Sequence, residues 1–220
     1  MRKLVQRQET TLLVATVWPR SALSCVSLLV MVLLWGLAES RAEMARWNVD
    51  PAHSTVGFQV AHMVISKTNG KFTDYTGFIE MDPEQKVVRA IEATIYTKSV
   101  FTDHEKRDAH LRSPDFFDVE RYPTMTYKLK RYWKTGELYT AVGELTLLGV
   151  TKEITLVGTF HGVVKDPWGN YRAGFSAEGT INRKDFGMKF HKTLDNGGLL
   201  VGDEVKIILE IEVIKEKHAT

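Results

Sequence analysis

The sequence predicts an all-β protein whose antiparallel strands close into one barrel, with a single short helix. Apolar and polar residues alternate with a period of two along most of the chain from Arg46 onward, which is the pattern of strands that bury one face. No helical segments alternate with these strands, so βαβ units and a parallel sheet are not expected. The number of strands, about eight or nine, favours closure, because open sheet edges invite aggregation.

Segment 1–42 is predicted to be a signal peptide, which leaves 43–220 as the folded domain. Basic residues precede an uncharged run at Ser21–Ala38, and small residues follow it. This order is typical of a secretory signal with cleavage after Ala42 or Ala45. The alternative is a retained membrane anchor, because the run is close to the roughly 18 residues that a spanning helix needs. We favour cleavage and expect a periplasmic or secreted protein.

The charge balance argues against nucleic acid as a partner. The whole chain has 29 Lys and Arg and 27 Asp and Glu. Segment 1–42 holds five of the basic and two of the acidic residues, so 24 and 25 remain in the predicted domain. Nucleic-acid binding needs a basic surface that displaces counterions. The sole cysteine, Cys25, also lies in this segment, so the domain is expected to contain no disulfide and no Cys-ligated metal.

The expected strands follow one another at short intervals. The pattern is clearest at Val205–Val213, where the alternate apolar residues take one face. The others, in order, are Val56–His62, Lys71–Met81, Ile91–Thr97, Thr124–Trp133, Leu138–Leu147, Ile154–Val164 and Arg172–Ile181. Turn-forming residues separate several of them, because Asn, Gly and Pro favour turn geometry. These are Asn69-Gly70, Asp82-Pro83, Thr135-Gly136, Pro167–Asn170 and Asp195–Gly198.

One helix and an aromatic plug are expected in the longest gap between strands. Thr102–Glu105 matches the Ser/Thr-x-x-Glu capping box, so the helix should begin near Asp103. It should end by Ser113, because a proline follows and disfavours helical geometry in the residue before it. Phe116 and Phe117 come next and need an apolar environment. At least one of them should reach into the barrel. If this segment is extended, the two side chains point to opposite faces, so one ring should matter far more than the other.

The interior of the barrel is expected to hold a cavity. An eight-stranded barrel can be filled by its own side chains or can hold one ligand. Many of the residues in phase with large inward neighbours are small, which favours the cavity over the filled barrel. They are Ala93, Gly143, Gly158, Ala173, Ala177 and Gly179.

The sequence offers little catalytic or metal-binding chemistry. His104, Glu105 and Asp108 fall one residue short of a zinc-protease helix motif, because Asp108 stands where a second histidine is required. We interpret them as a solvated helix face. His62 is in phase with Phe58, either as a satisfied rim histidine or as a polar contact for a ligand headgroup. No nucleophile elbow or phosphate-binding loop occurs, so neither a catalytic residue, nor a bound metal, nor an enzyme cofactor is predicted.

Five segments span nearly all of the predicted domain and form a recognisable set: Val49–His62, Gly70–Phe72, His110–Tyr127, Gly143–Leu156 and Ile181–Met188. Together, and in this order, they resemble the YceI-like family of polyisoprenoid-binding, lipocalin-like periplasmic proteins. The resemblance implies an eight-stranded antiparallel lipocalin-like barrel with an internal apolar tunnel for a long isoprenoid or related lipid. It also implies a secreted or periplasmic location.

The leading hypothesis is a binding protein, not an enzyme, for a lipid such as a polyprenyl phosphate or an isoprenoid quinone. Phase along the strands and the plug predicts the lipid-binding residues Phe58, His62, Phe72, Ile91, Ile95, Phe116, Phe117, Tyr127, Leu145 and Phe175. One alternative is an enzyme that acts on a small amphiphile with His62 and His110 as acid–base groups. Another is a filled barrel that acts as a structural or stress partner. Transient membrane contact and a homodimer are left open.

Overall fold

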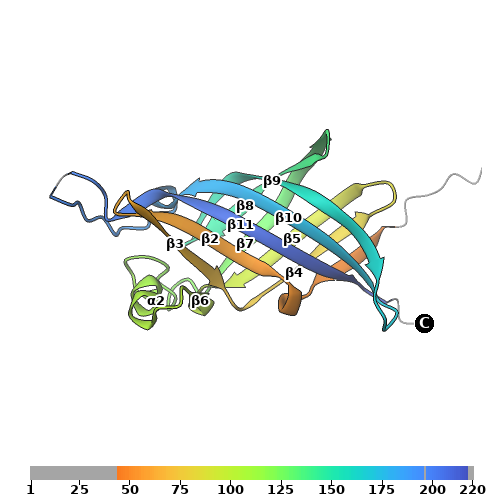
Figure 1. Cartoon of the computed structure of the whole chain (residues 1–220), viewed down its shortest axis with the longest axis horizontal. Coiled ribbons are helices and arrows are strands. Elements are labelled where there is room, and N and C mark those ends of the chain that lie inside the picture. The colour runs from red at the N-terminus through yellow and green to blue at the C-terminus, as the bar shows by residue number, and fades with distance from the viewer. Residues whose placement is uncertain (1–43, 196, 218–220) are drawn as a thin grey trace, which may run out of the picture. The chain divides into compact units, whose positions relative to one another are not determined.

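Eleven strands form one antiparallel sheet, and eight of them close into a barrel (Figure 1). The computed structural model describes residues 44–195 and 197–217. The ring runs β1 (Ala45–Val49), β4 (Tyr75–Asp82), β5 (Val87–Tyr96), β7 (Thr124–Thr135), β8 (Leu138–Leu147), β9 (Val150–Lys165), β10 (Tyr171–Asn182) and β11 (Val201–Lys215). Pairing of β1 with β11 completes it. The predicted closed antiparallel barrel is therefore confirmed, whereas the predicted signal at 1–42 lies outside the described residues.

The remaining strands extend from the edge of β11. β2 (Thr55–His62) pairs with β11 over Val201–Glu210, β3 (Ser66–Phe72) pairs with β2, and β6 (Val100–Phe101) pairs with β3. β1 pairs with the other part of the same edge, at Val213–Lys215. A short 3₁₀ turn, η1 (Pro51–His53), separates β1 from β2. The long strand β11 therefore pairs both with strands of the ring and with the first strand of the extension.

The turn predicted at Asn69-Gly70 was wrong. Both residues lie inside β3, and the chain turns instead at Met63–Ile65. The register explains the glycine, because Gly70 pairs with Phe58 and the phenyl ring lies over it. A Cβ at Gly70 would come within 2.3 Å of the Phe58 Cζ atom. The glycine makes room for a cavity-lining ring and does not form a hairpin turn.

The predicted helix is present, but it begins two residues later than expected. α2 spans Glu105–Arg112, and Ser113 is its C-cap, as predicted. The N-cap is His104, whose Nδ1 accepts a hydrogen bond from the Arg107 amide at 3.2 Å. Thr102 is instead hydrogen-bonded to the buried carboxylate of Asp108. This carboxylate accepts from the Thr102 amide at 2.9 Å and from the Thr102 hydroxyl. Asp108 therefore ties the helix to the barrel and does not belong to a solvated face.

Two apolar clusters occupy different parts of the barrel. One gathers around the plug and includes Phe72, Phe116, Phe117 and Phe186. The other is centred on Trp47, which is 1% exposed, and joins β1, β4, β10 and β11. We call the end with α2, the turn Met63–Ile65 and the loop 191–200 the plug end. The opposite end, with the turns after β4 and β9, is the hairpin end (Figure 1).

Two further 3₁₀ turns complete the described structure, η2 (Thr97–Ser99) and η3 (Arg183–Phe186). No helix among the described residues has both the length and the apolar character needed to cross a bilayer.

Candidate ligand-binding cavity

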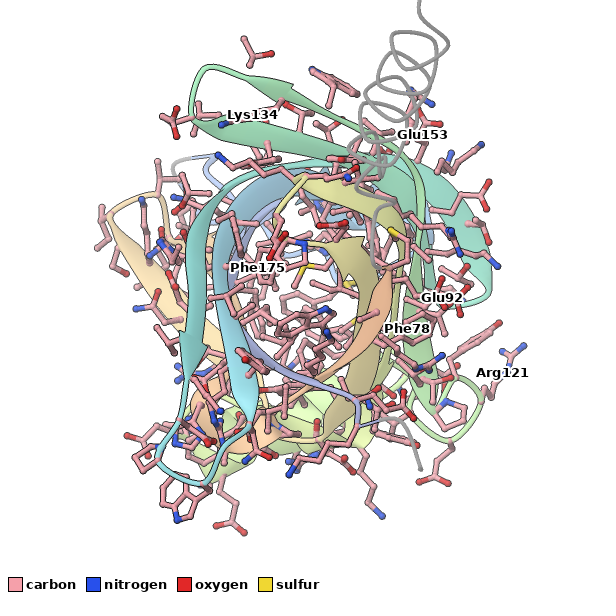
Figure 2. The ribbon with its side chains drawn as sticks, turned by 90° about the vertical axis from the view of Figure 1, so that its right-hand side faces the viewer. Phe78, Glu92, Arg121, Lys134, Glu153 and Phe175 are labelled. Atoms are coloured by element: carbon pink, nitrogen blue, oxygen red, sulfur yellow. The ribbon has the colours of Figure 1, made fainter. Side chains whose placement is uncertain are left out.

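A cavity of about 620 Å³ occupies the interior of the barrel, a size in the range of ligand pockets, about 300–1,000 Å³. Looking along the barrel from the hairpin end, Figure 2 shows side chains projecting inside the ring of strands, with Phe175 on its inner side. All ten residues predicted to bind a lipid line this cavity: Phe58, His62, Phe72, Ile91, Ile95, Phe116, Phe117, Tyr127, Leu145 and Phe175. Their contact with a lipid remains a prediction.

Strand alternation explains the apolar wall. Ile207, Leu209 and Ile211 lie on one face of β11, and all three line the cavity. Ile91, Ala93 and Ile95 do the same on β5. Most charged lining residues lie toward the two ends: Lys106, Arg107 and Arg183 at the plug end, and Asp82 at the end of β4 and Lys86 in the turn that follows. Glu92, in the middle of β5, is the exception. The wall can therefore hold a long apolar molecule, and polar contacts are available at its ends.

Both phenylalanines of the plug are buried and line the cavity. Phe116 is 7% exposed and Phe117 is 8% exposed. At least one ring was expected to enter the barrel, and both line the cavity. The two rings do not point to opposite faces, because the segment is not extended. The Phe116 amide donates to the Ser113 carbonyl and the Phe117 amide to the Leu111 carbonyl, both at 3.0 Å. These tight turns after the helix bring both rings inward.

The two rings have different neighbours. Phe116 stacks on Phe190, with ring centroids 5.0 Å apart, and meets the edge of His110 at 5.1 Å. Phe117 packs edge-on against Phe72 at 5.4 Å. The first ring therefore joins the helix to the segment after η3, and the second joins the plug to the barrel wall.

The small residues expected to create the cavity act in three ways. Ala93, Gly158 and Ala177 line it directly. Gly143 and Gly179 instead accommodate large side chains, because a Cβ would come within 2.5 Å of the Tyr127 Cζ atom or 2.7 Å of Leu156 Cδ2. Ala173 is buried in the Trp47 cluster and does not line the cavity. Only part of the predicted set therefore creates open space.

Tyr127 contributes its ring, not its hydroxyl, to the cavity. The ring lies over Gly143, and the Oη atom is buried without a hydrogen-bond partner among the described residues. Burial raises the pKa of Tyr127 to about 12, so the hydroxyl stays protonated at neutral pH. Tyr127 acts in the wall as an apolar residue.

The two histidines proposed for acid–base chemistry lie at the plug end. His62 is the last residue of β2, and its side chain has no hydrogen-bond partner among the described residues. His110 Nε2 lies 2.9 Å from Asp115 Oδ2, and both side chains are exposed. In the part of the chain that the structure describes, no hydrogen bond joins the His110 ring to His62 or to a serine, threonine or cysteine side chain. The arrangement thus lacks the activated nucleophile of a hydrolase.

A charged network holds the hairpin end together. The Arg172 guanidinium donates to Asp50 at 2.7 Å, to Asp166 at 2.9 Å and to Glu212 at 2.5 Å. Burial raises the pKa of the Asp50 carboxyl, but hydrogen bonds from His53 and Arg172 outweigh it, so the pKa lies below its ordinary value. The hydrogen bond from Arg172 also holds the pKa of Asp166 well below its usual range.

This network contains a group of potential metal ligands that the sequence did not indicate. Oxygen and nitrogen atoms of Asp50, His53 and Glu212 lie within 4.8 Å of one another. The Arg172 cation already contacts both carboxylates. The cluster is therefore better explained as an ion-pair network than as a metal site.

Sequence reasoning missed cavity residues that follow η3. Met188 and Phe190 line the cavity next to the plug, yet they lie outside any alternating strand. The buried Arg183 fixes this segment by donating to the carbonyls of Phe190 at 2.7 Å and Gly202 at 2.8 Å. The available signal in the sequence was Phe190, an aromatic residue close to the segment Ile181–Met188, which contains Arg183.

Comparison with known proteins agrees with this geometry. The family model described as YceI-like domain matches residues 47–213. A UPF0312 protein of Pectobacterium carotovorum is 36% identical over 192 residues, covering 87% of this chain and 97% of the relative. A UPF0312 protein of Yersinia enterocolitica is 38% identical over 178 residues, covering 80% of this chain and 90% of that protein.

Solved structures share the fold. The YceI protein of Campylobacter jejuni is 34% identical, with a TM-score of 0.63, over 71% of this chain and 90% of that one. A polyisoprenoid-binding domain from Saccharophagus degradans has a TM-score of 0.59 over 79% of this chain and 100% of that domain. It is 14% identical, so the likeness concerns the fold alone.

Proposed function

This chain belongs to the YceI-like family, and on that premise we propose that it binds a long-chain isoprenoid or a related amphiphilic lipid inside its barrel, as a carrier or store. The observation that carries the proposal is the cavity, whose wall is mainly apolar along the strands and carries most of its charged residues toward its ends. A prenyl chain makes no hydrogen bonds, so its affinity must come from buried apolar area, about 25 cal/mol per Å². Association and ordering costs offset much of that sum.

The plug end is the better place for a headgroup. Lys106 and His62 line the cavity there, and neither side chain has a partner among the described residues. Lys106 would pair with the phosphate of a polyprenyl phosphate, and His62 would hydrogen-bond to the carbonyl of a quinone. The charged residues of the turn after β4 are of both signs, so they favour neither headgroup. With the headgroup at the plug end, the isoprenoid tail of either lipid would extend toward the hairpin end.

The fold neighbour from Saccharophagus degradans supports the ligand class without defining it. That domain is a polyisoprenoid-binding domain, and a shared barrel offers the same kind of interior. No observation at His62 or His110 favours the enzymatic alternative, and we propose no catalytic residue, metal or enzyme cofactor.

Mass spectrometry of lipid extracted from protein purified from its native host tests the proposal directly. The expected result is a stoichiometric isoprenoid-type lipid. Ala177→Phe should lower its occupancy, because Ala177 lines the cavity and the added ring fills it. Val157→Phe is the matched control, since Val157 pairs across from Glu178 and is 40% exposed. Wild-type protein without lipid, or equal occupancy in both variants, would overturn the proposal.

We also propose that the protein works in the periplasm or outside the cell, after removal of segment 1–42. The order of basic, apolar and small residues supports this. The intact mass of the exported protein tests it, because a species that keeps Ser21–Ala38 would be membrane-anchored instead.

A further inference from the structure

The turn between β2 and β3 consists of three consecutive apolar residues, two of which are exposed. Val64 is 75% exposed and Ile65 is 83% exposed, while Met63 is partly buried. Met63 and Val64 have φ angles of 51° and 65°, a left-handed conformation that is rare for a β-branched residue. Glycine or asparagine would form this turn more easily. An exposed, strained and apolar turn is therefore present where folding alone would favour polar residues.

This turn lies beside residues that line the plug end of the cavity. The Met63 amide donates to the Leu200 carbonyl at 3.0 Å, and His62 and Leu200 both line the cavity. Figure 1 shows the turn beside the loop 191–200 at the plug end. A surface that covered Val64 and Ile65 would thus also lie against the plug end of the cavity.

Exposed lysines flank the turn. Lys67 lies on β3, Lys192 lies on the loop 191–200, where its carbonyl accepts from the Leu200 amide at 2.9 Å, and Lys189 precedes that loop. The exposed acidic residues over the same segments are Asp195 and Glu204. Exposed apolar residues beside lysines match an anionic lipid bilayer, because the apolar side chains insert at the acyl boundary and the cations approach the headgroups.

We propose that the plug end docks on an anionic bilayer through Val64, Ile65 and the lysines beside them. The inference rests on the proposed function, since it supplies the route by which a water-insoluble lipid enters or leaves the cavity. Docking at this end places the plug end of the cavity on the membrane, so a lipid that passes there need not cross water.

Flotation of the purified domain with phosphatidylethanolamine vesicles, with and without phosphatidylglycerol, tests the proposal. The double variant Val64→Asn with Ile65→Ser should bind the anionic vesicles about tenfold more weakly, because it removes two inserting side chains. It should fold normally, because asparagine tolerates the left-handed conformation. Trp168→Ser is the matched control, since Trp168 is 77% exposed in the turn at the hairpin end.

The outcomes separate this inference from the proposed function. Loss of binding in the double variant alone, with dependence on phosphatidylglycerol, supports docking by the plug end. Equal binding of wild type and double variant, or loss only in Trp168→Ser, overturns it. Copurified lipid is measured on the same preparations. Normal lipid content without vesicle binding would overturn docking alone, whereas vesicle binding without any copurified lipid would overturn the proposed function alone.

Discussion

The two ends of the barrel are stabilised by different interactions. At the plug end, aromatic rings from the segment after α2 and from the segment after η3 pack into the cavity. At the hairpin end, one guanidinium joins three carboxylates, and the buried Trp47 belongs to a separate apolar cluster. The apolar contacts at the plug end can be exchanged for contacts with a ligand. The four residues of the ion-pair network do not line the cavity, so their contacts should be independent of a ligand.

The largest expected effect comes from truncating the plug. Phe116→Ala and Phe117→Ala should each lower the free energy of unfolding by about 3–5 kcal/mol, from lost burial and a residual cavity. Both should also lower the amount of copurified lipid, because both rings line the cavity. Urea unfolding and lipid extraction measure the two effects. A strong effect from one ring alone would show that the other only packs the loop.

A methyl group at Gly70 should have a smaller effect at the same end. Gly70→Ala places its Cβ against the Phe58 ring, and overpacking of this kind costs about 1–3 kcal/mol. Gly174→Ala on β10 is the control, since its Cβ would make only ordinary contact with His161 at 3.5 Å. Thermal unfolding of the two variants tests this expectation. Equal Tm values would mean that the Phe58 ring moves away from the added methyl group without loss of stability.

Removal of Arg172 should weaken the hairpin end without emptying the cavity. Arg172→Met leaves Asp50, Asp166 and Glu212 without their shared cation, so the Tm should fall at neutral pH while copurified lipid stays. Lipid loss equal to that of the plug variants would contradict the division of roles between the two ends.

Acid should reduce the difference between wild type and Arg172→Met. The folded pKa values of Asp50 and Asp166 lie below their ordinary value of 3.8. Their contribution to stability is therefore complete above that value and is lost as the pH falls through the folded pKa values. At pH values below about 4, the Tm of the wild type should fall, and the Tm of the variant should fall less. Parallel Tm curves would show that Arg172 does not set these pKa values.

A chelator should have the smallest effect, with no change in Tm. Arg172 contacts both carboxylates of the Asp50, His53 and Glu212 group, which leaves no anionic site for a divalent cation. Thermal melts with and without EDTA test this, and stoichiometric zinc or iron in the purified protein would contradict it.

Alternation along the strands predicted the closed barrel and the lining residues because burial of one face imposes a period of two. It failed where tertiary contacts determine a residue's role. Gly70 looked like a turn residue, but the ring of Phe58 on the neighbouring strand requires it. Thr102 looked like a helix cap, but Asp108 engages it. The strained turn at Val64 has no turn-forming residue to mark it, and Arg172 meets partners up to 122 positions away.

The pairing between β1 and β11 also determines when the barrel can close during folding. Val49 pairs with Val213 and Trp47 with Lys215, so the ring joins segments from opposite ends of the domain. Contacts of such high sequence separation form slowly, because the intervening loop must first be closed at an entropic cost. The barrel cannot close until residues near Lys215 are available, however early the other hairpins form. When the N-terminal part of the domain emerges first, the barrel therefore stays open. Its apolar interior stays exposed until almost the whole domain has emerged.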